Sequence, residues 1–281
     1  MVLTTFLIAG MAHQVLAKDK VNVGKMIKEM LTGRKSQTQL PCLTKTYGSF
    51  SIDEAYKIQA ALARKVSKTL GPVVGYKVAY ASKAAQQQFD MDGPASGPLL
   101  LLQRVPTGSK LPAHVFIGLL IETEIAFTLS KRIDRPIKDV TEIKDYVKWV
   151  HTAFDLGDSR FVEGQTKPTP QDAIASGAGA HFFVLGPAME PGKVDVDKIT
   201  LKLIKNGKVI TDSPSTNVMG SPWNSLLWLA NHVVKLGGKL QPGMVVVTGT
   251  AAPAYKVKGD EIKGDYLGDC GPLGKVTLTI E

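Results

Sequence analysis

The chain has 281 residues, of which 44% are hydrophobic and 21% charged, a composition typical of a globular protein that buries a sizeable core. Its net charge is +9, but the basic residues are dispersed and no nucleic-acid-binding motif is recognisable. We therefore expect small anionic substrates and no nucleic-acid partner. We also expect no stable membrane insertion, since no internal segment has the length and apolarity of a membrane span.

The N-terminus has features of a secretory signal. Residues 6–12 are apolar, Val15-Leu16-Ala17 has the small residues of a cleavage site, and the charged Lys18 follows. We expect residues 1–17 to be removed and the mature protein to be periplasmic or secreted. The alternative is a cytoplasmic protein whose N-terminus forms an ordinary amphipathic helix.

The two cysteines, Cys42 and Cys270, leave two alternatives open. In an oxidising compartment they could form a disulfide, whereas otherwise both would be structural thiols. The five histidines are scattered, and neither they nor the cysteines have the spacing of a zinc site.

Three segments have the start and stop signals of helices. Ser51 and Glu54 fit a capping box, and the helix that they begin should end at Gly71. A second helix is predicted from Asp139, and a third from Ser221, where a proline follows at the first helical position. Their apolar stripes are, in the same order, Ala55, Ile58, Leu62 and Val66; Ile143, Val147, Val150 and Phe154; and Leu226, Leu229, Val233 and Leu236.

Strand signals dominate after residue 110. Asn206-Gly207 separates two apolar runs and predicts a hairpin with a two-residue turn, while residues 165–173 are predicted to be a loop that borders a site. The predicted strands are 115–129, 181–185, 201–205, 208–210, 244–248 and 276–280. The patterns predict an α+β fold, in which an N-terminal helical and lid region over 18–110 joins a β-rich catalytic core over 111–281 in one compact domain.

Two acidic residues, Glu122 and Glu124, lie two positions apart within an apolar run. Side chains alternate along a strand, so both carboxylates should point to the same face. Two like charges on a buried face repel each other and resist desolvation, and a hard divalent cation such as Mg²⁺ or Mn²⁺ would relieve both costs. The alternative is a half-exposed strand with a solvated acidic face.

Two more charged residues are candidates for the same site. Lys77 lies in an apolar, strand-like context, where partial desolvation would lower its pKa and make it a usable base. Alternatively, its ammonium extends to solvent. Asp155, placed at the end of the second predicted helix, is either a third metal ligand or a solvated acid at a helix terminus.

From residue 21 to residue 281 the chain resembles the hydratase/decarboxylase branch of the fumarylacetoacetate hydrolase superfamily. Members of this branch include 2-oxopent-4-enoate hydratases and 2-oxo-3-hexenedioate decarboxylases. The resemblance rests on several motifs in the family's order. They are Gly75-Tyr76-Lys77-Val78, the Ser-Lys-Ala-Ala-Gln-Gln-Gln run at 82–88, the Glu-Thr-Glu-Ile-Ala-Phe run at 122–127, Asp158-Ser159-Arg160, the Gly-Ser-Pro-Trp-Asn run at 220–224, and Pro242-Gly243 before Thr248-Gly249.

The resemblance implies a mixed β-roll core with flanking helices and a site that uses Mg²⁺ or Mn²⁺. The implied metal ligands are Glu122, Glu124 and Asp155, and Lys77 would transfer a proton. A small anionic 2-oxo acid would chelate the metal, which stabilises an enolate as a Lewis acid; water then adds in a hydratase, and carbon dioxide leaves in a decarboxylase. We also expect a homo-oligomer. The candidates for substrate binding are Thr248, Gly249 and Asp92.

The chain departs from the family pattern at this site. Asp155 stands where the family usually has Glu, and Ala95 replaces the acid of its P-D-F/Y-G segment. The A-D-N-A-S segment reads Ala-Ser-Gly-Ala-Gly at 175–179, which loses those polar groups. We expect a divergent metal-dependent lyase of the hydratase or decarboxylase type, acting on a 2-oxo or 2-hydroxydienoic acid. The alternatives are an acylpyruvate-type hydrolase or tautomerase, and a non-catalytic exported protein that binds oxo-acids.

Overall fold

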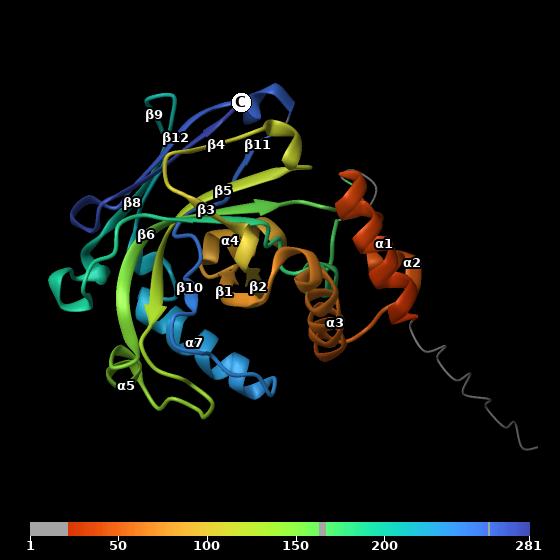
Figure 1. Ribbon diagram of the computed structural model, residues 1–281, viewed down its shortest axis with the longest axis horizontal. Coiled ribbons are helices and arrows are strands. Elements are labelled where there is room, and N and C mark those ends of the chain that lie inside the picture. Colours follow the sequence, from red (N-terminus) through yellow and green to blue (C-terminus); the bar gives the residue numbers. More distant parts are fainter. Residues whose placement is uncertain (1–21, 163–166, 258) are drawn as a thin grey trace, which may run out of the picture.

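Two sheets form the centre of the molecule, and helices pack around them (Figure 1). The computed structural model describes residues 22–162, 167–257 and 259–281. The α+β class, with a mixed sheet and flanking helices, is confirmed. Residues 1–17 lie outside the described residues, so their removal on export stays a prediction.

The larger sheet carries the strands that meet at the candidate site. Its order is β2-β1-β10-β5-β6-β7-β3, and β11 pairs with β5 outside this path. The pairs β1–β10 and β3–β7 are parallel and the others antiparallel. Its strands are β1 (Val73–Ala79), β2 (Ala95–Leu100), β3 (Arg104–Pro106), β5 (Leu119–Leu129), β6 (Val147–Asp158), β7 (Phe182–Leu185), β10 (Val245–Val247) and β11 (Tyr255–Val257).

The smaller sheet confirms the predicted hairpin. Asn206 and Gly207 have φ values of 50° and 79°, which the favoured two-residue hairpin turn requires at both central positions. The order is β4-β13-β12-β8-β9. These strands are β4 (Ser109–Leu111), β8 (Thr200–Lys205), β9 (Lys208–Pro214), β12 (Gly264–Asp269) and β13 (Lys275–Ile280).

Two of the three predicted helices form as expected. The α3 helix (Ile52–Leu70) begins with a complete capping box between Ser51 and Glu54. The α7 helix (Pro222–Lys235) begins where the Ser221 hydroxyl accepts a hydrogen bond from a backbone N–H. The other helices are α1 (Val23–Ser36), α2 (Leu43–Tyr47), α4 (Lys83–Phe89), α5 (Val140–Lys144) and α6 (Pro170–Ala175).

The second predicted helix is wrong beyond its first turn. Asp139 does cap α5, but this helix ends at Lys144, and β6 begins at Val147. Apart from Ile143, the stripe that suggested a helix lies in a central strand buried on both faces, where apolar residues need not alternate. The predicted loop is also partly wrong, because α6 begins at Pro170.

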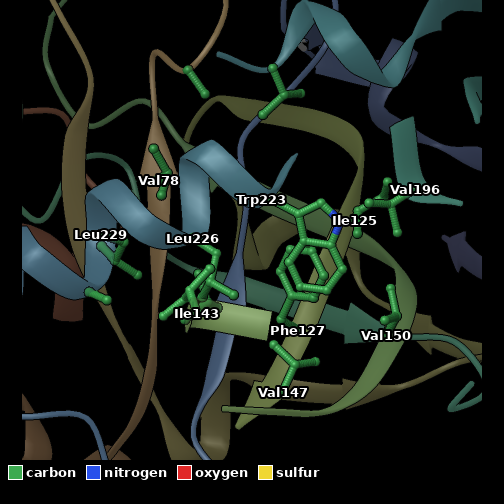
Figure 2. Packing of buried hydrophobic residues seen from close by; sticks show 14 of the residues in the cluster. Val78, Ile125, Phe127, Ile143, Val147, Val150, Val196, Trp223, Leu226 and Leu229 are labelled. Atoms are coloured by element: carbon green, nitrogen blue, oxygen red, sulfur yellow. The ribbon is translucent and has the colours of Figure 1, made fainter. Parts of the chain in front are cut away.

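The largest buried cluster lies where α7 covers the larger sheet. In Figure 2 the ring of Trp223, from α7, lies over the ring of Phe127, from β5, with the ring centroids 4.5 Å apart. This cluster fixes one face of β5, so the residues that alternate with Phe127 are directed to the other face.

The remaining predictions about the whole chain have mixed outcomes. The strands β1 and β2, from the N-terminal part of the chain, lie in one sheet with β10 and β5, from the C-terminal part. Cys42 and Cys270 are both buried and do not form a disulfide with each other. Within the described parts of the chain, every helix is too short or too polar to cross a bilayer.

Candidate metal centre and its cavity

The larger sheet brings the three predicted acids together. Glu122 on β5 lies directly opposite Asp155 on β6, and Glu124 is two residues further along β5 on the same face. One carboxylate oxygen from each residue lies within 4.8 Å of the others. Glu124 and Asp155 have no exposed surface and Glu122 is half-buried, so neither a fully solvated acidic face nor a solvated helix terminus is observed.

Lys77 joins the acids from two strands away. Its register with Val247 on β10, and that of Val247 with Ala126 on β5, place Lys77 on the same face as Glu124. Lys77 is 4% exposed, and its ammonium donates to Asp155 Oδ2 as an ion pair. It therefore does not extend to solvent.

Burial and mutual repulsion dominate the electrostatics of the acids. Burial raises the pKa of Glu122 to about 8, and Asp155 adds to the rise while Lys77 opposes it. Burial, and then Asp155 and Glu122, also raise the pKa of Glu124. Burial lowers the pKa of Lys77, but Asp155, Glu122 and Glu124 outweigh it, so the pKa is raised. The predicted lowering of the Lys77 pKa is therefore wrong when only the protein side chains act on it.

Two buried oxygens of the cluster have no hydrogen-bond partner among the described residues. They are Glu124 Oε1 and Asp155 Oδ1. An orphaned buried carboxylate oxygen is costly, and one ammonium among three carboxylates leaves a formal excess of two negative charges. A hard divalent cation prefers such oxygen ligands and would satisfy both the charge and the orphaned atoms. The residues present therefore fit Mg²⁺ or Mn²⁺.

The segment after β10 supports the acids. The Gly249 N–H donates to Glu124 Oε2 at 2.5 Å. Position 249 requires glycine for two reasons. Its φ is 93°, and a Cβ added there would lie only 2.4 Å from the Ala81 Cβ. The Thr248 hydroxyl donates to the Ile125 carbonyl at 2.9 Å and so ties β10 to β5. Two of the three predicted substrate residues, Thr248 and Gly249, thus have contacts that position Glu124.

Asp92, the third predicted substrate residue, takes no part in these contacts. It lies in the bend after α4 and is exposed. It is also absent from the residues that line the cavity described next. Its predicted contact with substrate stays a prediction.

A cavity of about 560 Å³ lies where β5 begins and β6 ends, and none of the three acids is among its lining residues. Leu120, which shares a face of β5 with Glu122, lies in its wall, and so does Tyr80 at the end of β1. Burial is the main reason that the pKa of Tyr80 rises to about 12, with smaller and opposite effects of Lys77 and Glu122. Sequence reasoning missed Tyr80, although it follows the Gly75-Tyr76-Lys77-Val78 motif closely.

A charged network borders the same cavity. Asp158 Oδ1 accepts from the backbone N–H groups of Ile117 and Gly118, and Asp158 forms an ion pair with Arg160. Arg160 donates to His181 Nδ1 at 3.0 Å, and His181 Nε2 is 2.9 Å from the Val115 carbonyl, which requires a neutral imidazole protonated at Nε2. Burial and then Arg160 lower the pKa of His181 to about 3. The motif Asp158-Ser159-Arg160 thus holds the start of β5.

Comparison with known proteins identifies the fold family. The family model for the fumarylacetoacetate (FAA) hydrolase C-terminal region matches residues 73–279. The chain belongs to this family. The predicted β-roll with flanking helices is the fold of this family, and the matched residues include all three acids and Lys77.

Two relatives of the chain are named as hydratases. The chain is 26% identical over 232 residues to a 2-keto-4-pentenoate hydratase of Paraburkholderia xenovorans (strain LB400), covering 82% of this chain and 86% of the relative. It is 26% identical over 249 residues to the 2-oxo-hept-4-ene-1,7-dioate hydratase of Escherichia coli, covering 86% and 92%.

Solved structures agree on the fold. The structure of 4-oxalocrotonate decarboxylase from Pseudomonas putida G7, complexed with magnesium and adipate, matches with a TM-score of 0.84 at 22% identity, covering 92% of this chain and 97% of that one. Fumarylpyruvate hydrolase from Pseudomonas aeruginosa, in complex with Mn²⁺ and pyruvate, matches less well, with a TM-score of 0.55 at 17% identity over 74% of this chain and 90% of that one.

Proposed function

We propose that this FAA hydrolase family protein is a divalent-metal-dependent lyase, of the hydratase or decarboxylase type, that acts on a small 2-oxo or 2-hydroxydienoic acid. The observation that carries the proposal is the convergence of Glu122, Glu124 and Asp155 beside the buried Lys77. The hydratase relatives support the reaction class.

Each residue has a separate part in this proposal. Glu122, Glu124 and Asp155 hold the cation, which when bound supplies a Lewis acid for the carboxylate and keto oxygens of a 2-oxo acid. Gly249 keeps one oxygen of Glu124 in place. Lys77 holds a proton at its Nζ atom and exchanges it with the carbon skeleton next to the keto group. The buried apolar surroundings of these groups exclude bulk water and strengthen each electrostatic contact.

The departures from the family pattern place more of the chemistry on Lys77. Ala95 lies opposite Ala79 in the β1–β2 ladder, on the same face as Lys77, so the position where the family has an acid carries only a methyl group. Among the described residues, Lys77 is therefore the charged proton carrier in contact with the acids.

The first prediction tests the cation. Replacing Glu124 by Gln removes one charged ligand, so the affinity for Mg²⁺ or Mn²⁺ measured by calorimetry should fall at least tenfold. Metal-dependent deuterium exchange into a 2-oxo acid should fall with it. The matched control is Glu190→Gln, an exposed residue outside the site, which should change neither quantity. Undiminished metal affinity in the Glu124 variant would contradict the proposed centre.

The same assays separate the alternatives. Exchange together with hydration or decarboxylation of a dienoic acid supports a lyase. Cleavage of an acylpyruvate carbon–carbon bond would instead identify a hydrolase, and exchange without either reaction would identify a tautomerase. Metal-dependent binding of an oxo-acid without any exchange would identify a binding protein.

A further inference from the structure

The larger sheet is interrupted beside the three acids. Strands β10 and β11 both pair with the edge of β5 that β6 does not occupy, but they leave residues 122–125 of β5 without a strand beside them. The chain that joins β10 to β11, residues 248–254, runs past this gap, and we call it the bypass segment. Because its seven residues span the length of four, it must arch out of the sheet. Its Gly249 N–H donates to Glu124 Oε2, so the position of the segment decides whether that carboxylate keeps its donor.

Two side chains from other elements hold the bypass segment beyond Thr248. The Asn217 amide donates to the Ala251 carbonyl at 3.1 Å. The Gln88 amide, from α4, donates to the Ala254 carbonyl at 3.2 Å and accepts from the Ala254 N–H at 2.9 Å. Gln88 thus satisfies both backbone groups of one residue, as a neighbouring strand does for a hydrogen-bonded pair. This contact fixes the end of the segment in both position and orientation.

Helix α4 connects this contact to the strand that carries Lys77. Strand β1 ends at Ala79, and the chain turns at Tyr80, whose φ is 58°. The Gln86 side chain donates to the Tyr80 carbonyl at 3.0 Å, so α4 is tied to the end of β1. One short helix therefore holds the end of β1 and, through Gln88, the end of the bypass segment.

We propose that Gln88 is a positioning residue of the metal centre. By holding Ala254 it keeps the bypass segment in place, so that the Gly249 N–H stays on one oxygen of Glu124 and the other oxygen is left to the cation. Among the described residues, Gln88 has no hydrogen bond to the three acids or to Lys77, so its effect passes through the segment. The inference rests on the proposed function for its effect on the cation, but not for its effect on Gly249.

The first measurement needs no metal. In the metal-free full chain, NMR follows the exchange of the Gly249 amide hydrogen with solvent. Gln88→Met keeps the length of the side chain but loses both hydrogen bonds, so this exchange should become at least about tenfold faster. The Phe154 amide, in a strand paired on both edges, reports global unfolding, and its exchange should change less than about twofold. A selective effect on Gly249 distinguishes positioning from a general loss of stability.

The second measurement is the Mg²⁺ affinity by calorimetry. It should fall about 3- to 30-fold in Gln88→Met, because a displaced Gly249 N–H no longer orients Glu124. Gln87→Met, at the exposed neighbouring position of α4, is the matched control and should change neither measurement. Gln88→Glu keeps the acceptor for the Ala254 N–H but loses the donor, so it should accelerate Gly249 exchange less than Gln88→Met does. This variant gives a second reading if the Met variant folds poorly.

Three results would overturn the inference. They are unchanged Gly249 exchange in Gln88→Met, equal acceleration at Gly249 and Phe154, and selective acceleration without any loss of Mg²⁺ affinity. Failure of the underlying function gives a different result, because the wild type would then bind Mg²⁺ no more tightly than Glu124→Gln, whatever happens to the exchange at Gly249.

Discussion

At the residue scale, the central feature is a lysine whose charge is retained by the acids around it. Lys77 donates to Asp155, and the three carboxylates keep its pKa above the ordinary value. A divalent cation among the same carboxylates would oppose the lysine charge and remove this support. The proton on Lys77 is therefore linked to the cation, which is suitable for a group that must exchange it.

Replacing Lys77 by Met should separate metal binding from chemistry. The side chain keeps its length but loses the proton carrier, so 2-oxo acid deuterium exchange should fall by about 10²–10⁴-fold. Metal affinity should persist or improve, because the acids lose a competing positive charge. Lys110→Met, at an exposed ion pair with Glu281, is the control. Exchange within a few-fold of wild type would remove Lys77 from the mechanism.

A second residue-scale prediction concerns Gly249. In Gly249→Ala the new Cβ would lie 2.4 Å from the Ala81 Cβ and 2.8 Å from the Val78 carbonyl, so the segment must shift away from Glu124. We expect a loss of about 1–3 kcal/mol in the free energy of unfolding together with weaker Mg²⁺ binding. Gly243→Ala tests the cost of a positive φ alone, because its φ is 84° but no atom lies within 4 Å. Equal effects of the two changes on Mg²⁺ affinity would refute the role given to Gly249.

The site could be predicted from sequence only in part, and the reason is the distance along the chain over which its contacts form. The shared face of Glu122 and Glu124 was predictable, because side chains two positions apart in a strand point the same way. The pairing of Asp155 with Lys77 depends on the order of four strands, which no local pattern specifies. The left-handed backbone of Tyr80 likewise has no signal in its residue type.

At the element scale, the structure depends on β5 and β6, which are the long strands at the centre of the larger sheet. Helix α3 and the β8–β9 hairpin were predictable because capping boxes and Asn-Gly turns are local signals. The strand β6 was not, because a strand buried on both faces has apolar residues at every spacing, including that of a helix.

An element-scale prediction follows from the His181 network that holds the start of β5. The folded pKa of His181 is about 3 and its ordinary value 6.5, so below pH 6.5 the unfolded chain binds a proton that the folded chain does not. The free energy of unfolding should therefore fall as the pH decreases from 6.5 toward 3, by up to about 1.4 kcal/mol per pH unit from this group.

The comparison of His181→Gln with wild type isolates this effect, with Mg²⁺ present throughout. The variant should be less stable at pH 7, but its stability should decline less steeply between pH 6.5 and pH 5 in chemical denaturation. His114→Gln, at an exposed histidine, should keep the wild-type slope. If the His181 variant keeps the wild-type slope as well, the neutral imidazole is not a source of acid sensitivity.

At the scale of the whole molecule, two predictions concern its state in the cell. If residues 1–17 form a signal peptide, mass spectrometry of protein isolated from its native cells should show a chain beginning at Lys18. An intact Met1 in the cytosolic fraction would contradict export.

The expected homo-oligomer would show as a multiple of the chain mass in light scattering.

The position of β10 between β1 and β5 has a consequence for the order in which the molecule is assembled. All three acids lie on β5 and β6, which are neighbours in the chain and can pair early in folding. Lys77 is connected to β5 through β10, because residues 75–77 pair with residues 245–247 and these pair with β5. A chain in which β1 and β10 have not joined β5 therefore lacks the contact between Lys77 and the acids, and a divalent cation could then balance their charge. We therefore expect occupation of the proposed metal site to stabilise the folded chain.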